Sequence, residues 1–205
     1  MIRFVVLTGL PGVGKTDMLA RLAAAGEQVL DLEALAGNRG SSFGRVGLSV
    51  DEPSEAEFHR LIADALAGFD PARLVWVEDE GPHIGRLWLP HDVIKALAEA
   101  ETVELTCPIE QRVERLTATY GVAPVAELIA ATQQIRRRLG NSRTDRAISH
   151  FQAGRPERAI RVLLEYFDDG YARRAAADRR RRLSGPMVEL VETLTAGRAS
   201  RDPDH

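Results

Sequence analysis

The sequence predicts an α/β fold in which a parallel sheet flanked by helices continues into an α-helical C-terminal extension. Three observations lead to this prediction. Short apolar runs, such as residues 4–7 and 73–77, alternate with stretches of helical periodicity. A glycine-rich loop follows the first run and precedes the first helical stretch, which is the order of a strand, loop and helix unit. From residue 125 onward, every periodic pattern is helical.

The composition is that of a globular protein. With 205 residues, 44% of them hydrophobic and 28% charged, the chain suits one domain with room for an appended subdomain. The single cysteine, Cys107, excludes an internal disulfide framework and a cysteine-cluster metal site. No apolar run approaches the roughly 20 residues of a membrane span, and the first residues lack the order of a secretory signal. We therefore expect a cytoplasmic protein with no membrane partner.

The net charge of -3 hides an asymmetry between the two halves of the chain. Residues 1–129 carry 11 basic and 20 acidic side chains, whereas residues 130–205 carry 16 basic and 10 acidic ones. The basic half is suited to a polyanion such as RNA. The alternative is a solvated, arginine-rich helical surface, which composition alone favours slightly.

Residues 9–16 read Gly-Leu-Pro-Gly-Val-Gly-Lys-Thr, the pattern G-x-x-x-x-G-K-[ST] of a P-loop, or Walker A motif. Its glycines let main-chain N–H groups approach an anion, and the helix that follows adds its positive dipole end. Lys15 is expected to pair with the outer phosphates, and the Thr16 hydroxyl to bind Mg²⁺. The alternative is a glycine turn with a chance lysine. The pattern predicts a P-loop NTPase-like core whose cofactor site comprises Gly9, Pro11, Gly12, Val13, Gly14, Lys15, Thr16 and Asp17.

The first elements follow from the apolar runs and their boundaries. We expect a strand over residues 2–8, buried on both faces, and a helix over residues 16–25. A short strand over residues 28–32 ends near Asp31 and Glu33. Carboxylates at the carboxyl end of a strand lie where ligands bind in an open α/β sheet, so both are candidate substrate contacts.

The next segment is rich in glycine and serine. Residues 35–44, which include Arg39, predict an ordered or ligand-ordered loop and not a strand. A helix is expected over residues 54–66, because Ser54 and Glu57 have the spacing of a capping box.

A third strand, over residues 73–77, precedes Glu78-Asp79-Glu80. An apolar strand that ends in acid is the Walker B arrangement, in which a carboxylate such as Glu78 orients Mg²⁺ or its water. The alternative is an acidic surface turn. Residues 83–90 predict a turn followed by a short apolar piece.

A helix over residues 91–100 and a fourth strand over residues 102–106 complete the predicted core sheet. Cys107 follows the strand as a small buried hydrophobe. In the next helix, residues 108–120, Arg112 and Arg115 share one face and are candidates to neutralise a transferred phosphate. The alternative is that they are surface arginines paired with Glu110 and Glu114.

The remaining chain predicts five helices and a frayed end. The predicted domain organisation is a P-loop nucleotide-binding core over residues 1–122, a helical extension packed on it over 123–195, and a disordered tail over 196–205. The expected helices span residues 125–139, 145–152, 156–166, 171–183, which carries four consecutive arginines, and 186–195.

Several segments resemble the C-terminal P-loop domain of the tRNA 2-selenouridine synthase family. The most specific is the stretch from Asp31 to Gly44. Where the family usually has a serine and basic residues, this chain has Gly81-Pro82-His83. The resemblance runs from residue 5 to about residue 171, and its other segments are residues 76–80 with 84–85 and Pro90, 112–120, 138–140, and 163–168 with Tyr171.

The resemblance implies a role at the wobble 2-thiouridine of tRNA, where the family replaces sulfur by selenium through a geranylated intermediate and selenophosphate. It implies ATP, GTP or a prenyl diphosphate as the ligand, with Mg²⁺, and tRNA held by the basic helices. The residues predicted to bind substrate are Asp31, Glu33, Arg39, Gly40, Ser41, Ser42 and Glu80. The residues predicted to act in catalysis are Lys15, Asp31, Glu78, Arg112 and Arg115.

Full-length members of the family carry an N-terminal rhodanese domain with a catalytic cysteine. Met1 stands two residues before the first strand, so we expect this chain to work with a separate rhodanese-like protein or as a remnant. Two other functions remain open. One is a small-molecule kinase with Asp31 or Glu33 as base, and the other is a nucleotide-dependent binding module with little turnover.

Overall fold

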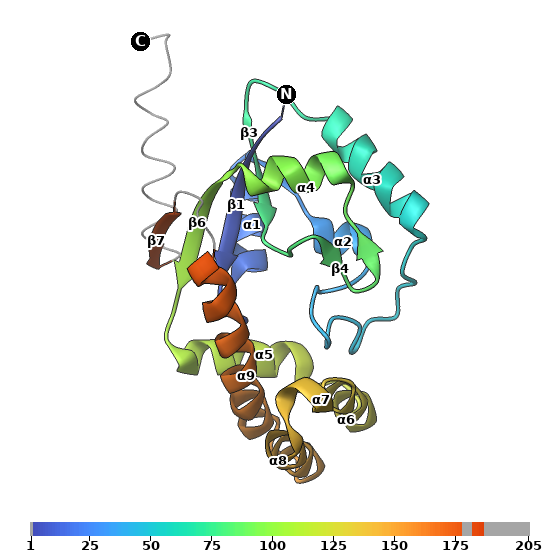
Figure 1. Ribbon diagram of the computed structural model, residues 1–205, viewed down its shortest axis with the longest axis vertical. Helices are drawn as coiled ribbons and strands as arrows, with labels where there is room; N and C mark the ends of the chain where they lie inside the picture. Colours follow the sequence, from blue (N-terminus) through green and yellow to red (C-terminus); the bar gives the residue numbers. More distant parts are fainter. Residues whose placement is uncertain (1, 178–181, 187–205) are drawn as a thin grey trace.

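The computed structural model describes residues 2–177 and 182–186. Its centre is a five-stranded, fully parallel sheet in the order β2-β3-β1-β6-β7 (Figure 1). A parallel sheet needs helical crossovers on its faces, as the alternation of patterns predicts. The strands are β1 (Arg3–Gly9), β2 (Gln28–Leu30), β3 (Leu74–Glu78), β6 (Glu101–Thr106) and β7 (Arg182–Pro186).

The central strand β1 is buried on both faces. Phe4 and Val6 point into a core formed with helices α2 (Leu32–Ala36), α3 (Glu55–Ala67) and α4 (His91–Ala98). Val5 and Leu7 alternate with them and point into a second core against α1 (Lys15–Ala24). The continuous apolar run therefore packs against helices on both faces of the sheet. The predicted α/β fold class is confirmed.

The segment after β2 differs from the prediction. The strand ends at Leu30, and the Asp31 carboxylate accepts a hydrogen bond from the Ala34 amide at 2.9 Å, which caps the short helix α2. A side chain that accepts a hydrogen bond from an amide of the first turn stabilises the start of a helix. It therefore favours α2 at this position and not a longer strand. Further along, the predicted turn and short apolar piece form a hairpin of β4 (His83–Ile84) and β5 (Leu87–Trp88).

The later helices gather beyond the carboxyl ends of the strands (Figure 1). The helix predicted over residues 125–139 is broken at Ile135, and the two helices predicted over residues 156–166 and 171–183 are one continuous helix as far as Ala177. That helix accommodates Gly170 in its interior at a modest cost in propensity. The helices are α5 (Ile109–Tyr120), α6 (Val125–Gln134), α7 (Arg136–Leu139), α8 (Asn141–Gln152) and α9 (Pro156–Ala177).

The expectation that every element after residue 125 is helical is wrong at β7. This strand pairs with β6 in parallel, from Thr102 opposite Arg182 to Thr106 opposite Pro186. Because proline has no N–H to donate, it is tolerated on an edge strand such as this one. The expected helix over residues 186–195, beyond its first residue, and the expected tail over residues 196–205 lie outside the described residues.

The division into a core and a helical extension stays a prediction. The extension has its own apolar cluster, in which Leu128, Ala147 and Leu163 pack with Phe43 and Val46 from the loop after α2. In the part of the chain that the structure describes, every helix is too short or too polar to cross a lipid bilayer.

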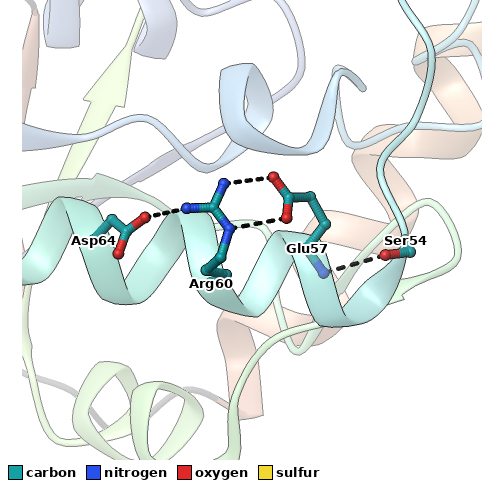
Figure 2. Close-up of polar contacts among 4 residues, drawn as sticks. All are labelled: Ser54, Glu57, Arg60 and Asp64. Carbon is teal, nitrogen blue, oxygen red and sulfur yellow. Dashed lines mark hydrogen bonds and ion pairs between the residues drawn. The ribbon is translucent and has the colours of Figure 1, made fainter.

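Helix α3 begins with the predicted side-chain cap. The Ser54 hydroxyl oxygen accepts the Glu57 amide hydrogen at 3.2 Å, and Arg60 lies between the carboxylates of Glu57 and Asp64 (Figure 2). The side chains of all three charged residues are exposed. Exposed ion pairs contribute little, so we expect the cap to contribute more to stability than the ion pairs.

Substituting Ser54→Ala should lower the free energy of unfolding by about 1 kcal/mol, because an amide at the start of α3 loses its acceptor. Urea denaturation monitored by circular dichroism measures this change. Arg60→Gln is the control on the same helix and should have a smaller effect that disappears at high salt. A larger loss for Arg60→Gln than for Ser54→Ala would contradict this ranking.

Candidate functional site

The glycine loop connects β1 to α1 in the shape that the motif predicts. Gly14 adopts a left-handed conformation with φ 102° and immediately precedes the first helical residue, Lys15. Gly12 has φ 77°, and a Cβ placed on it would lie 2.8 Å from the Leu116 side chain of α5. Only glycine fits there, so the loop packs directly against α5. The loop amides and the amino end of α1 thus share one small region.

Lys15, Thr16 and Glu78 meet at the carboxyl end of the sheet. The Lys15 ammonium lies 3.3 Å from one Glu78 oxygen, and the Thr16 hydroxyl donates to the other oxygen, also at 3.3 Å. Glu78 is the last residue of β3 and is only 6% exposed. The sequence placed these groups in two separate motifs, and the neighbouring strands β1 and β3 bring them together.

Two further carboxylates lie beside Glu78. One oxygen from each of Glu33, Glu78 and Glu80 falls within 4.8 Å of the other two. Glu33 is carried by α2, the helix that Asp31 caps, and Glu80 follows β3. Carboxylate oxygens are the ligands that Mg²⁺ prefers, so these three side chains and the Thr16 hydroxyl are the residues suited to hold such a cation.

Burial and mutual repulsion alter the ionisation of this group. Burial alone would lower the pKa of Lys15, but the Glu78, Glu80 and Glu33 carboxylates outweigh it and the pKa of Lys15 is raised. Burial, and then the charge of Glu78, raises the pKa of Glu33 to about 8. The same two causes, together with Glu33, raise the pKa of Glu80 well above its usual range. The raised pKa values favour the protonated forms of Glu33 and Glu80 near neutral pH.

The loop after α2 is ordered by its own contacts. The Asn38 side chain is buried, accepts the Gly40 amide hydrogen at 3.0 Å and donates to Glu52 at 3.3 Å. Arg39 donates to the Val46 carbonyl at 3.1 Å, and its guanidinium lies over the Tyr120 ring, 5.7 Å from the centroid. These contacts place residues 39–42 along one wall of the site.

Gly40 in this loop approaches the acidic cluster closely. Its φ is 69°, and a Cβ there would overlap the Glu80 carboxylate. A residue without a side chain is therefore required for the loop to close against Glu80. Gly40 and the Walker A glycines come from different parts of the chain and line the same cavity as the acidic cluster.

The two arginines of α5 have different partners. Arg112 is buried, donates to the Pro11 carbonyl at 2.8 Å and forms two hydrogen bonds with Asp168. Arg115 donates to the Gly12 carbonyl at 2.6 Å and to Asp17 at 3.0 Å, and its side chain is one-third exposed. Both therefore hold carbonyls of the glycine loop, and only Arg115 also lines the cavity described next.

A cavity of about 970 Å³ extends from the glycine loop to the C-terminal helices. The predicted residues that line it are Gly9, Pro11, Gly12, Gly14, Lys15, Thr16, Asp17, Glu33, Arg39, Gly40, Ser41, Ser42, Glu78, Glu80 and Arg115. Three predicted residues do not line it. Val13 packs in the core, Asp31 caps α2, and Arg112 is enclosed between the loop and α9.

Sequence reasoning missed the far wall of this cavity, which is mainly apolar, although Arg138 and Tyr166 also line it. Its members come from the loop after α2 and from α5, α6, α8 and α9. Their helical periodicity shows that each helix has an apolar face, but not that those faces enclose a space next to the P-loop. The main residues of this wall are Phe43, Leu116, Leu128, Ile135, Phe151, Ile160, Leu163, Leu164 and Phe167.

A parallel sheet, a Walker A loop at its carboxyl edge and an acidic strand end next to the loop lysine define a P-loop domain of the nucleotide-binding class. A family model described as "tRNA 2-selenouridine synthase AAA domain" matches residues 2–198, and the chain belongs to this family. The resemblance predicted from the sequence is thereby confirmed.

Curated relatives agree with this assignment. The tRNA 2-selenouridine synthase of Hahella chejuensis is 36% identical over an alignment 202 residues long. The alignment covers 83% of this chain and 52% of that protein. The tRNA 2-selenouridine synthase of Pseudomonas putida strain GB-1 is 33% identical over an alignment 234 residues long. This alignment covers 98% of this chain and 61% of that protein. The chain thus spans about half the length of these relatives.

Two solved structures are more distant. A gluconokinase from Sinorhizobium meliloti 1021 is 16% identical with a TM-score of 0.42, and the match covers 97% of this chain and 92% of that one. A tRNA isopentenylpyrophosphate transferase from Bacillus halodurans is 14% identical with a TM-score of 0.44, covering 98% and 97%. At these TM-scores, neither likeness contributes to the assignment.

The raised pKa of Glu33 gives the free protein a pH-dependent stability. Between pH 4.5, the ordinary value for a glutamate, and about 8, folded Glu33 keeps a proton that the unfolded chain has released. The free energy of unfolding should therefore fall as pH rises through this range. Urea denaturation in metal-free buffer at several pH values measures the slope.

Glu33→Gln should reduce this slope, because the amide does not ionise. Glu99→Gln removes an exposed carboxylate from the end of α4 and is the matched control, which should keep the parent slope. If Glu33→Gln retains the full pH dependence, the assignment of the raised pKa to this carboxyl is wrong.

Proposed function

We propose that this chain is the diphosphate-binding part of an enzyme that modifies the wobble 2-thiouridine of tRNA, and that its P-loop ligand is a prenyl diphosphate. The observation that carries the proposal is the shape of the cavity. One end consists of glycine-loop amides, Lys15 and carboxylates, and the other end is a wall of apolar side chains. A diphosphate joined to a hydrocarbon chain has the same division between a charged and an apolar part.

The phosphate end supplies the groups that a diphosphate requires. Loop amides and Lys15 would bind the phosphate oxygens, and Thr16 with Glu78 would hold Mg²⁺. Arg115 lines the same end and would add a further positive charge. Magnesium bound there would neutralise charge on the diphosphate as it leaves.

The apolar end supports a prenyl ligand over a nucleoside triphosphate. Phe43 and Phe167 meet edge to face, with ring centroids 6.5 Å apart, and Leu163 and Leu164 from α9 line the same space. Burying hydrocarbon there contributes about 0.8 kcal/mol for each CH₂ group. In the reaction we propose, the thiouridine sulfur bonds to the first prenyl carbon while the bond from that carbon to the diphosphate oxygen breaks. The diphosphate leaves with the electron pair of that bond, and the N3 proton of the thiouridine is released to solvent.

Membership of the family supports a proposal about the RNA and protein partners. Transfer RNA would contact the arginine-rich surface of α7 to α9, through salt-dependent phosphate contacts. Several arginines there are already paired, such as Arg136 with Asp145 and Arg143 with Glu165, which leaves fewer charges for RNA than the sequence suggests. We further propose that rhodanese chemistry comes from another domain or protein, and that the reaction takes place in the cytoplasm.

Lys15→Ala should weaken the binding of inorganic pyrophosphate with Mg²⁺ by about tenfold or more, because a charge-assisted contact disappears. Isothermal titration calorimetry measures the affinity. The chain has one other lysine, Lys95, which is exposed on α4. Lys95→Ala is therefore the matched control and should bind as the parent does. Equal affinities for parent and Lys15→Ala would remove Lys15 from the site.

The prenyl part of the proposal predicts that geranyl diphosphate binds more tightly than inorganic pyrophosphate. Phe167→Ala should reduce this advantage several-fold, because the hydrocarbon loses contact area, while pyrophosphate affinity stays unchanged. Pyrophosphate binding thus serves as the internal control for folding. Equal affinities of the parent for both ligands would overturn the prenyl assignment. Tighter binding of ATP, with consumption stimulated by one metabolite, would favour the kinase alternative.

A further inference from the structure

The buried Arg112 occupies a position that phosphate binding does not use. Its side chain is 3% exposed and lies between the glycine loop and α9. The Nε group donates to the Pro11 carbonyl at 2.8 Å, and the two terminal nitrogens donate to the two Asp168 oxygens at 2.9 and 2.5 Å. The planar guanidinium therefore links the loop to a helix that lies far from it in the sequence.

Stability alone is a weak reason for such a pair. Removing two charges from water costs free energy that a well-packed apolar pair does not cost, so buried ion pairs are often neutral or unfavourable overall. The unusual feature here is the third bond, which fixes a main-chain carbonyl of the P-loop.

The bond to Pro11 also determines the direction of the next amide. A trans peptide unit is planar, with its carbonyl and N–H on opposite sides, and no peptide bond in the described residues is cis. Because Arg112 holds the Pro11 oxygen toward α5, the Gly12 N–H is held away from α5. Gly12 lines the cavity, and an N–H held away from α5 is in a position to serve as one of the loop amides at the phosphate end.

A second arginine acts on the following peptide. Arg115 donates to the Gly12 carbonyl, and the Val13 N–H on the other side of that peptide donates to Leu10. Two consecutive peptide groups of the loop are thus hydrogen-bonded to arginines of α5. Only Arg112 is held in turn by α9, through Asp168.

We infer that Arg112 and Asp168 are positioning residues that hold the P-loop in its phosphate-binding shape, so that phosphate affinity depends on helix α9. The inference rests on the proposed phosphate site. Helix α9 contacts the core again at Tyr171, whose hydroxyl donates to Glu104 at 2.6 Å. The same helix carries Leu164 and Phe167 of the apolar wall, and it therefore connects both ends of the cavity.

Asp168→Asn tests this dependence with little change in size. An amide nitrogen then faces the guanidinium, and the two-bond pairing is lost. We expect the dissociation constant for inorganic pyrophosphate with Mg²⁺ to rise about tenfold, as is typical when a group that orients a ligand is removed. Asp169→Asn is the control, because it alters the neighbouring carboxylate on the same helix, which is 58% exposed.

Amide hydrogen exchange separates positioning from a general loss of stability. In the ligand-free protein, Asp168→Asn should lose protection in the loop residues 10–15 while β1 and β3 keep theirs. A uniform loss across the sheet would indicate a structural role only and would overturn the inference.

The double variant Arg112→Leu with Asp168→Leu sharpens the test. Replacing both charges by apolar groups should restore thermal stability relative to Asp168→Asn, while pyrophosphate affinity stays low because Pro11 has lost its donor. Recovery of affinity with stability, or parent-like binding by Asp168→Asn, would overturn the inference. These tests use inorganic pyrophosphate and not geranyl diphosphate. A failure of the prenyl proposal can therefore be distinguished from a failure of this inference.

Discussion

The rest of the site depends on one ammonium group placed among three carboxylates. Lys15 contacts Glu78 directly, and Glu33 and Glu80 lie within reach of the same charge. In a buried site these charges are weakly screened, so the carboxylates cannot all ionise without further positive charge. The raised pKa values of Glu33 and Glu80 reflect this repulsion, because protonation of these groups relieves it. In the proposed function, a divalent cation would supply positive charge when a phosphate ligand is bound, and the cation would then be part of phosphate binding.

This charge arrangement depends on the sheet. The loop lysine follows β1, Glu78 ends β3, and these strands are paired in parallel, so their carboxyl ends meet at one edge. The helix that follows β2 carries Glu33 to the same edge. Burial of β1 in two apolar layers fixes its register, and any shift of that register would separate Lys15 from Glu78.

The sequence predicted the parts of this arrangement that local pattern determines. The strand, loop and helix around Lys15, the acidic end of β3 and the Ser54 cap all rest on neighbouring residues. It did not predict β7, because residues 182–186 contain arginine, glycine and proline and pair only where an edge of the sheet is open to them. Asp31 was interpreted as a catalytic group from its position after a strand, although the same position suits a helix cap.

The arginines of α5 show why spacing alone was not sufficient. The three-residue interval correctly places Arg112 and Arg115 on one face of the helix, but it does not say what lies opposite that face. Their partners come from residues 11, 12, 17 and 168, and only the fold brings these segments together. The apolar wall was missed for the same reason, because each helix shows its apolar stripe in sequence and the cavity exists only between the stripes.

The C-terminal helices therefore do more than cover the sheet. A P-loop alone recognises a phosphate group by its charge and its main-chain amides, and it places few demands on the rest of the ligand. Here α9 forms part of the wall of the space next to the loop, and it also holds a loop carbonyl through Asp168 and Arg112. If the proposed site binds a phosphate ligand, we expect discrimination between such ligands to come from the fit of their non-phosphate part against the apolar wall, to which α9 contributes, because the loop offers every ligand the same amides.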